Sequence, residues 1–214
     1  MADPSNFSMV DQRRGYYQAL EQMNAGTYKA SGDIIDWSLW DTVVLDAAVP
    51  SNRMFINGLG TVVAGAARQL ADTNVEGRQG GIPQGSKLYV KAIKIFYTQS
   101  ATVHTEEFIR DWYRMLEQTT INLVISGKAS YGQWTLAEVF GQTVGMVMEP
   151  AAAADNYSMA TISRAIGILP LNLPIVLASN VTFDVTMQHW TAPTANLDDD
   201  KIKLALCGIL ERLS

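Results

Sequence analysis

The stretch VTFDVTMQHW, residues 181–190, has the most regular strand pattern in the chain. One set of alternate positions is apolar and ends in a histidine, and the other set is mostly polar. The first set is Val181, Phe183, Val185, Met187 and His189, and the second is Thr182, Asp184, Thr186, Gln188 and Trp190. Successive side chains of a strand point to opposite faces of a sheet, so this pattern predicts a strand with one face in the core and one polar face.

Downstream, a polar turn over residues 191–200 precedes a second strand pattern, KIKLALCGIL, residues 201–210. This segment directs Ile202, Leu204 and Leu206 inward as a closing strand. We expect these last two strands to be neighbours joined by a loop. Cys207 is the only cysteine of the chain and can form no internal disulfide, so a buried, inert thiol is predicted there.

Upstream, four further segments are predicted to be strands. In residues 120–127, Ile121, Leu123 and Ile125 share one face, and after a turn at Gly127-Lys128 another candidate strand runs through Tyr131 and Trp134. Residues 87–98, KLYVKAIKIFYT, are dense enough in β-branched and aromatic residues to predict burial on most of both faces. In residues 36–49, Asp41 interrupts an apolar face, which predicts a strand that is bent or bulged near Asp41.

Helical patterns are fewer than strand patterns. Residues 104–118 predict an amphipathic helix with Thr105 as N-cap and an apolar face of Phe108, Trp112, Met115 and Leu116. Residues 10–24 predict a short N-terminal helix or arm that ends near the sequence Asn24-Ala25-Gly26. The glycine-rich residues 58–86 predict a long surface excursion with a helical turn around Ala66–Leu70.

The chain as a whole is expected to contain about eight to ten short strands, without the alternation of strand and helix that builds a parallel sheet. The predicted fold is mainly β: an antiparallel β-sandwich, formed as a single jelly roll with one internal helix and an N-terminal helical arm. The arm is predicted over residues 1–26 and the sandwich domain over residues 27–214.

The composition of the 214 residues narrows the possible functions. There are 16 Lys and Arg against 21 Asp and Glu, a net charge of −5, and this acidic balance argues against specific nucleic-acid readout. Only 17% of residues are charged and 48% are hydrophobic, which excludes disorder. No apolar run approaches the roughly 20 residues of a membrane helix, and no secretion signal is recognisable, so we expect a soluble protein made in the cytoplasm.

Residues that carry catalysis or bind metals do not form a recognisable pattern. His104 and His189 are the only histidines, and their spacing does not suit a shared metal ion. We expect His189 to be half-buried at a strand end and His104 to be a solvated loop residue before a helix. Asp198, Asp199 and Asp200 could offer oxygens to a hard cation, but they lack the spaced ligands of a calcium loop, and a solvated turn is preferred. No catalytic, metal-binding or cofactor-binding residue and no cofactor is therefore predicted, and the protein is not expected to be an enzyme.

Several segments in order resemble the jelly-roll capsid (coat) proteins of tailless icosahedral bacteriophages. In such proteins a first strand leads into a glycine-rich loop, an Asp-Thr-Asn turn and a long strand, and an apolar closing strand ends near Gly and Arg, as at Gly208 and Arg212 here. The chain is shorter than the double jelly-roll coat proteins of this kind. The segments that carry the resemblance are residues 41–58, 71–96, 115–139, 174–190 and 201–213.

The resemblance implies a viral structural protein of the virion, made in the host cytoplasm, whose copies self-assemble into capsomers and an icosahedral shell. Its partners would be other copies of itself, further virion proteins and an internal membrane of the virion. The low charge and the amphipathic arm suit a subunit that buries much of its surface against its own copies. The residues expected to contact a neighbouring subunit lie in the arm: Arg13, Arg14, Tyr16, Tyr17, Leu20 and Met23.

A competing interpretation is a carbohydrate- or receptor-binding jelly-roll module of a virion or cell surface. The aromatic side chains of the chain could stack on sugar rings as well as pack between subunits. Specific glycan binding by a protein that stays small would favour this alternative.

Overall fold

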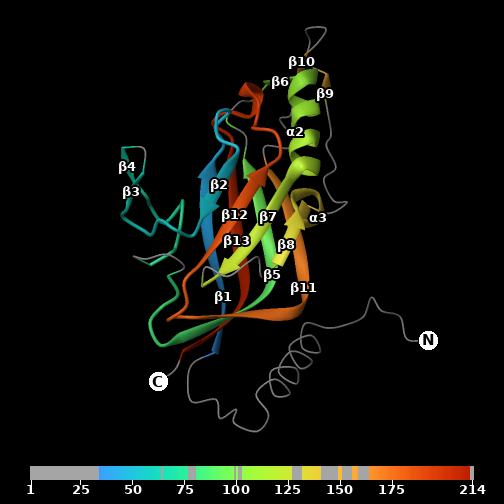
Figure 1. Ribbon diagram of the computed structural model, residues 1–214. Helices are drawn as coiled ribbons and strands as arrows, with labels where there is room; N and C mark the ends of the chain where they lie inside the picture. The colour runs from blue at the N-terminus through green and yellow to red at the C-terminus, as the bar shows by residue number, and fades with distance from the viewer. Residues whose placement is uncertain are drawn as a thin grey trace, which may run out of the picture.

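The computed structural model describes residues 34–63, 65–76, 81–98, 100, 103–126, 132–140, 149–150, 156–158 and 164–212. In this part of the chain the fold is mainly β, and every strand pair is antiparallel. Two four-stranded sheets lie face to face (Figure 1), an arrangement consistent with a β-sandwich. The mainly β, antiparallel fold class is confirmed.

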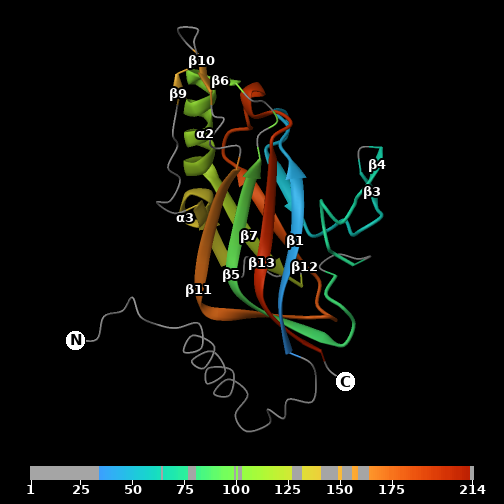
Figure 2. The same ribbon diagram turned by 180° about the vertical axis from the view of Figure 1, so that it is seen from behind.

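The first sheet has the order β1-β13-β5-β11, and the second has the order β2-β12-β7-β8. The strands of the first sheet are β1 (Ile34–Val44), β13 (Lys201–Arg212), β5 (Ser86–Thr98) and β11 (Arg164–Ala178). Those of the second sheet are β2 (Ser51–Met54), β12 (Phe183–His189), β7 (Thr119–Ile125) and β8 (Gly132–Thr135). Figure 2 shows the first sheet from behind, with β1 and β11 at its two edges.

Smaller elements decorate these sheets. A hairpin of β3 (Val62–Val63) and β4 (Ala66–Ala67) projects beside β1 (Figure 1). A three-stranded sheet, in the order β6-β10-β9, accompanies helix α2 at one end of the molecule. The remaining elements are β6 (Val103–Thr105), α2 (Glu106–Gln118), α3 (Leu136–Phe140), β9 (Glu149–Pro150), β10 (Asn156–Ser158) and the 3-10 helix η3 (Ala195–Leu197).

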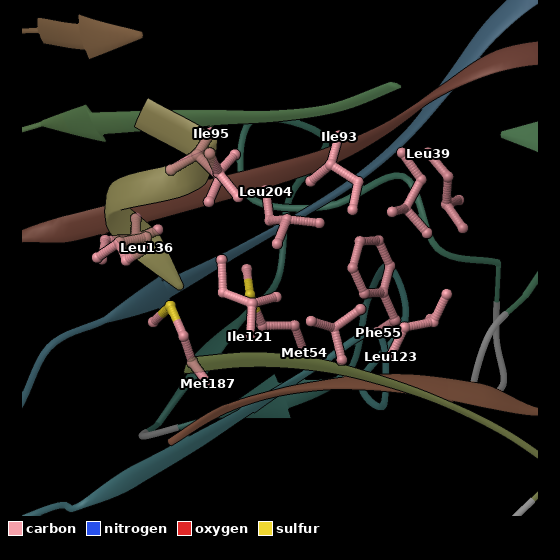
Figure 3. Close-up of a cluster of buried hydrophobic side chains, with 14 of the residues drawn as sticks. Leu39, Met54, Phe55, Ile93, Ile95, Ile121, Leu123, Leu136, Met187 and Leu204 are labelled. Carbon is pink, nitrogen blue, oxygen red and sulfur yellow. The ribbon is translucent and has the colours of Figure 1, made fainter. Parts of the chain in front are cut away.

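The hydrophobic core lies between the two four-stranded sheets (Figure 3). Leu39, Ile93 and Leu204 from the first sheet face Ile121 and Met187 from the second, and all five are at most 1% exposed. The inward faces predicted for β12 and β13 are confirmed, and so are Ile121 and Leu123 of β7. Ile125 of β7 is half-buried, and Asp184 is buried although it was expected on the polar face of β12. The alternation of apolar and polar side chains along the strands therefore turns one face of each sheet toward the core.

Helix α2 begins at Glu106, where the sequence predicts it, and buries the predicted face of Phe108, Trp112, Met115 and Leu116. The Trp112 ring packs between Tyr97 of β5 and Phe140 of α3, with ring centroids 4.0 and 5.6 Å away. These aromatic contacts join the helix to one end of the first sheet.

The predicted bulge near Asp41 is wrong. β1 pairs with β13 without a break from Ile34 to Val44. The irregularity lies on β5 instead, where Lys91 has no partner in β13 because the register shifts between Cys207 and Gly208. This extra residue moves the inward face of β5 from even to odd positions, so that Leu88 and Val90 are followed by Ile93 and Ile95.

Three other expectations are corrected by the structure. β5 is buried along one face and half-buried along most of the other, since a sandwich covers only one face of each sheet. β12 and β13 lie in different sheets, because the connection between them crosses one end of the sandwich through η3 and the buried Leu197. The turn expected to be helical at Ala66–Leu70 begins with β4, which pairs with β3.

The expected N-terminal helix lies outside the described residues, and so does the expected boundary between the arm and the sandwich domain at residues 26 and 27.

At the bulge, β13 approaches β5 so closely that only glycine fits at position 208. A β-carbon on Gly208 would lie 1.8 Å from the carbonyl oxygen of Tyr89. Gly208→Ala is therefore expected to lower the free energy of unfolding by about 1–3 kcal/mol, because backbone must shift to admit the methyl group. Urea denaturation measures this change, with Cys207→Ala as the neighbouring control. Equal stability of the two variants would contradict the close approach.

Candidate functional site

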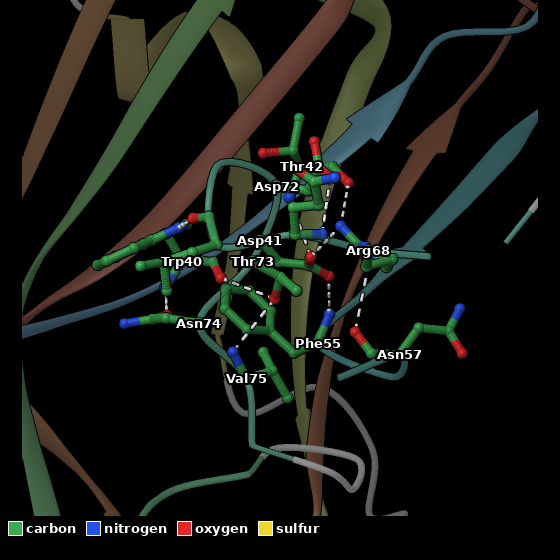
Figure 4. A network of polar contacts seen from close by, with 12 residues as sticks. Trp40, Asp41, Thr42, Phe55, Asn57, Arg68, Asp72, Thr73, Asn74 and Val75 are labelled. Atoms are coloured by element: carbon green, nitrogen blue, oxygen red, sulfur yellow. Dashed lines mark hydrogen bonds and ion pairs between the residues drawn. The ribbon is translucent and has the colours of Figure 1, made fainter. Parts of the chain in front are cut away.

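After β2 the chain folds back along the outer edge of β1 (Figure 4). We call this segment, residues 55–63 and 65–76, the excursion. The Trp40 N–H donates to Asn74 Oδ1 at 2.7 Å, and the Asn74 N–H donates to the Trp40 carbonyl at 3.2 Å. Asn74 Nδ2 also donates to the Ser38 carbonyl at 2.8 Å. Asn74 thus occupies the backbone groups that a neighbouring strand would use, and it closes this edge of the sheet.

A buried ion pair anchors the same excursion. Asp41 points into the core from β1, and its carboxylate lies 2.5 Å from the Arg68 guanidinium. The same carboxylate accepts hydrogen bonds from the Phe55 N–H at 2.6 Å and the Thr42 N–H at 3.0 Å. Arg68 in turn donates to the carbonyls of Thr42 and Asn57 (Figure 4). We call Asp41, Arg68, Phe55 and Asn74 the edge clamp.

The electrostatics of the edge clamp depend on Arg68. Burial raises the pKa of the Asp41 carboxyl above its usual value, and the Phe55 N–H and the Arg68 guanidinium oppose this rise in pKa. Phe55 is held at a φ of 65°, a conformation that is rare for a bulky residue, while its ring packs on Phe183 in the core. The start of the excursion is therefore fixed at Phe55 by two contacts, the backbone hydrogen bond to Asp41 and the ring contact with Phe183.

The clamped excursion presents apolar side chains to solvent. These side chains are Leu59 (47% exposed), Val62 (67%), Val63 (42%) and Leu70 (61%). A hollow of about 630 Å³ separates the β3-β4 hairpin from the sandwich, and Asp46, Asp72, Asp198 and Asp199 are among its lining residues. Apolar side chains gathered on an anchored projection are typical of a protein contact surface.

The three aspartates that end the β12–β13 connection point in different directions. Asp198 and Asp199 are exposed, as a solvated turn requires. Asp200 is 1% exposed, and there the expectation of a solvated turn is wrong: it accepts hydrogen bonds from the Tyr97 hydroxyl and, at 2.7 Å, from the Ser100 N–H. Burial and the Asp200 carboxylate raise the pKa of Tyr97. Among the described residues, no group of three His, Cys, Asp or Glu could hold a metal ion.

His189 is more deeply buried than the expected half-buried histidine at a strand end. It is 2% exposed and joins three strands, because its ring nitrogens lie 2.8 Å from Thr119 Oγ1 and 3.3 Å from Asn52 Nδ2. The Asn52 amide nitrogen can only donate, so Nε2 accepts and the proton resides on Nδ1. Burial lowers the pKa of His189 to about 4.

This buried imidazole makes the stability depend on pH. The unfolded chain, with a histidine pKa near 6.5, binds more protons than the folded chain between pH 6.5 and 4, so stability is lost as the pH falls through this window. The loss between pH 7 and pH 5 is expected to be about 2 kcal/mol larger in the unchanged protein than in His189→Gln. Urea denaturation at both pH values measures it, and identical losses would contradict a neutral buried His189.

Other predicted residues differ from expectation or lie outside the described residues. Cys207 is half-buried and accepts a hydrogen bond from Ser38 Oγ at 3.3 Å, so the prediction of a buried thiol is wrong. The backbone of His104 lies in β6, opposite Tyr157, and not in a loop. The predicted contact residues Arg13, Arg14, Tyr16, Tyr17, Leu20 and Met23 lie outside the described residues, and their role stays a prediction.

The sequence alone does not predict the edge clamp. Asp41 breaks an apolar pattern, and the pattern alone predicts a bulge there. A charged residue inside an otherwise regular inward face is also the signal of a buried partner, here Arg68. Arg68 lies in the glycine-rich excursion, where no periodicity marks it.

Comparison of the sequence with protein-family models gave no match, and comparison with curated proteins gave none. Over the described ranges, neither helix has the length and apolar character needed to span a membrane.

Proposed function

We propose that the eight strands of the two large sheets form a single jelly roll. Four antiparallel pairs support this, and they are nested in chain order: β7 with β8, β5 with β11, β2 with β12, and β1 with β13. Successive pairs alternate between the two sheets. Such nesting is what rolling one long hairpin into two layers would produce, and jelly rolls occur in capsid, lectin and cupin domains.

We propose that this jelly roll is a bacteriophage capsid subunit that self-assembles into capsomers and an icosahedral shell in the virion. The observation that carries the proposal is the clamped excursion, which holds four large apolar side chains in solvent beside the sheet edge. A fold alone does not select a function, but a rigid apolar projection suits repeated contact with further copies. The segments that resemble phage coat proteins include parts of β1, β5, β7, β12 and β13.

In this proposal, residues 1–26 form the arm that packs on a neighbouring copy. The contact residues of the arm are Arg13, Arg14, Tyr16, Tyr17, Leu20 and Met23. Other virion proteins and an internal membrane are further proposed partners. The proposal includes no cofactor, no nucleic-acid readout and no enzymatic activity.

Negative-stain electron microscopy of the purified full-length chain tests the proposal. We expect rings or closed shells of uniform size, and we expect far fewer of them after deletion of residues 1–24. Unchanged assembly after this deletion would contradict the role of the arm. Absence of any regular assembly in the full-length protein, over a wide range of concentration and ionic strength, would contradict the capsid function itself.

A second candidate function, binding of a carbohydrate, is favoured by Trp190. This side chain is 80% exposed at the end of β12, next in sequence to Thr191, which lines a hollow of about 270 Å³. The hollow also contains Asp111, Arg114 and Gln118, polar groups of the kind that bind sugar hydroxyls. A glycan array tests this function. Binding that Trp190→Ala abolishes and Tyr113→Ala preserves would support it, and absence of binding would contradict it.

A further inference from the structure

We propose that copies of this chain associate head to tail through the two opposite edges of the first sheet. In this contact the clamped excursion beside β1 of one copy packs on the outer side of β11 in the next copy. The inference rests on the proposed assembly function, because it names the surfaces through which assembly occurs.

The β11 edge exposes a second set of apolar side chains. Ile168 is 53% exposed, Leu173 is 76% exposed and Val176 is 37% exposed. Leu173 lies in an irregularity of β11, where the pairing with β5 stops at Pro170 and resumes at Ile175. We call Ile168, Leu173 and Val176 the β11 stripe.

Neither edge of the first sheet suits the addition of another strand. On β11, Pro170 and Pro174 lack the N–H that strand pairing requires, and the irregularity between them breaks the edge. On β1, Asn74 already holds the backbone groups of Trp40. Association at these edges must therefore use side chains, and both edges expose apolar ones.

The charges that flank the two apolar sets have opposite signs. Beside β11, β5 carries the half-exposed Lys87 and Lys94, and Lys94 is directly opposite Ile168. The third lysine of β5, Lys91, lines a hollow with Lys94 and Asp36. Beside the excursion, the hollow is bordered by Asp46, Asp72, Asp198 and Asp199. The two arginines of that hollow are already matched by carboxylates, since Arg68 pairs with Asp41 and Arg53 with Asp184. Lys201 also lines the hollow, and the four aspartates outnumber it. The acidic excursion side thus complements the basic β11 side.

The two surfaces lie on opposite sides of the molecule in both views (Figures 1 and 2). A contact between two different surfaces leaves one of each free on every pair, so further copies can be added. Such a contact produces a closed ring when the rotation between copies closes and a filament when it does not. A second copy of this chain is therefore the occupant that fits both surfaces.

Two single variants test the inference in the full-length chain. Val62→Asp places a charge on the excursion, and Leu173→Asp places one on the β11 stripe. Both residues are exposed, so the thermal unfolding temperature is expected to stay close to that of the unchanged protein. Sedimentation velocity is expected to show self-association at least about 30-fold weaker for each variant, as for loss of a central interface residue.

Mixing the variants distinguishes a head-to-tail contact from other contacts. Labelled Val62→Asp protein keeps an intact β11 stripe, so an excess of Leu173→Asp protein, with its intact excursion, is expected to restore its association. An excess of Leu59→Asp protein, altered on the same surface as Val62→Asp, is the matched control and is expected to restore nothing. Equal restoration by both mixtures would overturn the head-to-tail arrangement.

The failure of this inference differs from the failure of the proposed function. Variants that assemble like the unchanged protein would overturn the two surfaces and leave the capsid function standing. An unchanged protein that stays monomeric at every concentration would overturn both.

Discussion

Replacement of Arg68 by methionine is expected to lower the free energy of unfolding by about 3–5 kcal/mol. The Asp41 carboxylate is fully buried, and Arg68 is the cation that lies against it, at 2.5 Å. Methionine fills part of the volume of arginine but leaves this carboxylate without a counter-charge and the Thr42 carbonyl without its donor. Urea denaturation at neutral pH measures the loss.

A matched control for this variant is Arg53→Met. Arg53 forms an ion pair of similar length with Asp184, at 2.6 Å, but its side chain is 53% exposed, so a loss below about 1 kcal/mol is expected. Addition of Asp41→Asn to Arg68→Met should recover part of the stability, because it removes the buried charge. Equal stability of Arg68→Met and Arg53→Met would contradict the description of the edge clamp.

Trp112→Ala is expected to lower the free energy of unfolding by about 3–5 kcal/mol as well. Trp112 is 0% exposed, and its ring contacts Tyr97 and Phe140 from two different elements. Its Nε1 has no hydrogen-bond partner among the described residues, so we expect the loss to come from packing and from the cavity that remains. Denaturation monitored by circular dichroism measures the change.

The neighbouring residue on α2 provides the control for this variant. Tyr113 is 48% exposed, and Tyr113→Ala should change the stability by less than about 1 kcal/mol. If Trp112→Ala and Tyr113→Ala had similar effects, α2 would not be fixed to the sandwich through the face that the sequence predicts.

The sequence predicted those strands whose alternation is regular. In β7, β12 and β13 the inward positions are apolar except at one end, where β7 has Thr119 and β12 has His189, so the period of two is visible without tertiary information. The pairing of these strands was less predictable. β12 and β13 are close in sequence, which favours a hairpin, yet burial of Leu197 in the connection allows the chain to cross to the other sheet.

β11 was not predicted, because its sequence interrupts the period that identifies a strand. Gly167, Pro170 and Pro174 lie inside it, and the register with β5 shifts between Pro170 and Ile175. A long partner strand compensates for these interruptions, and such compensation is a tertiary effect. The β3-β4 hairpin was missed for a related reason, since small residues such as Ala66 and Ala67 suit a helical turn as well as a strand.

The edge clamp could not be assembled from sequence, although its residues were visible. The distance between Asp41 and Arg68 is set by how the excursion returns to β1, and that path depends on Asn74 and Thr73 bonding to Trp40. No local pattern encodes this return. The predicted contact residues of the arm lie outside the described residues, so they remain predictions that the deletion of residues 1–24 tests.

Sedimentation velocity of the purified full-length protein over a wide concentration range tests the central claim most directly. The account predicts species larger than the 23.4 kDa chain, whose size increases in discrete steps to trimers, pentamers, hexamers or shells. A strict monomer at every concentration would contradict self-assembly and would favour the carbohydrate-binding alternative.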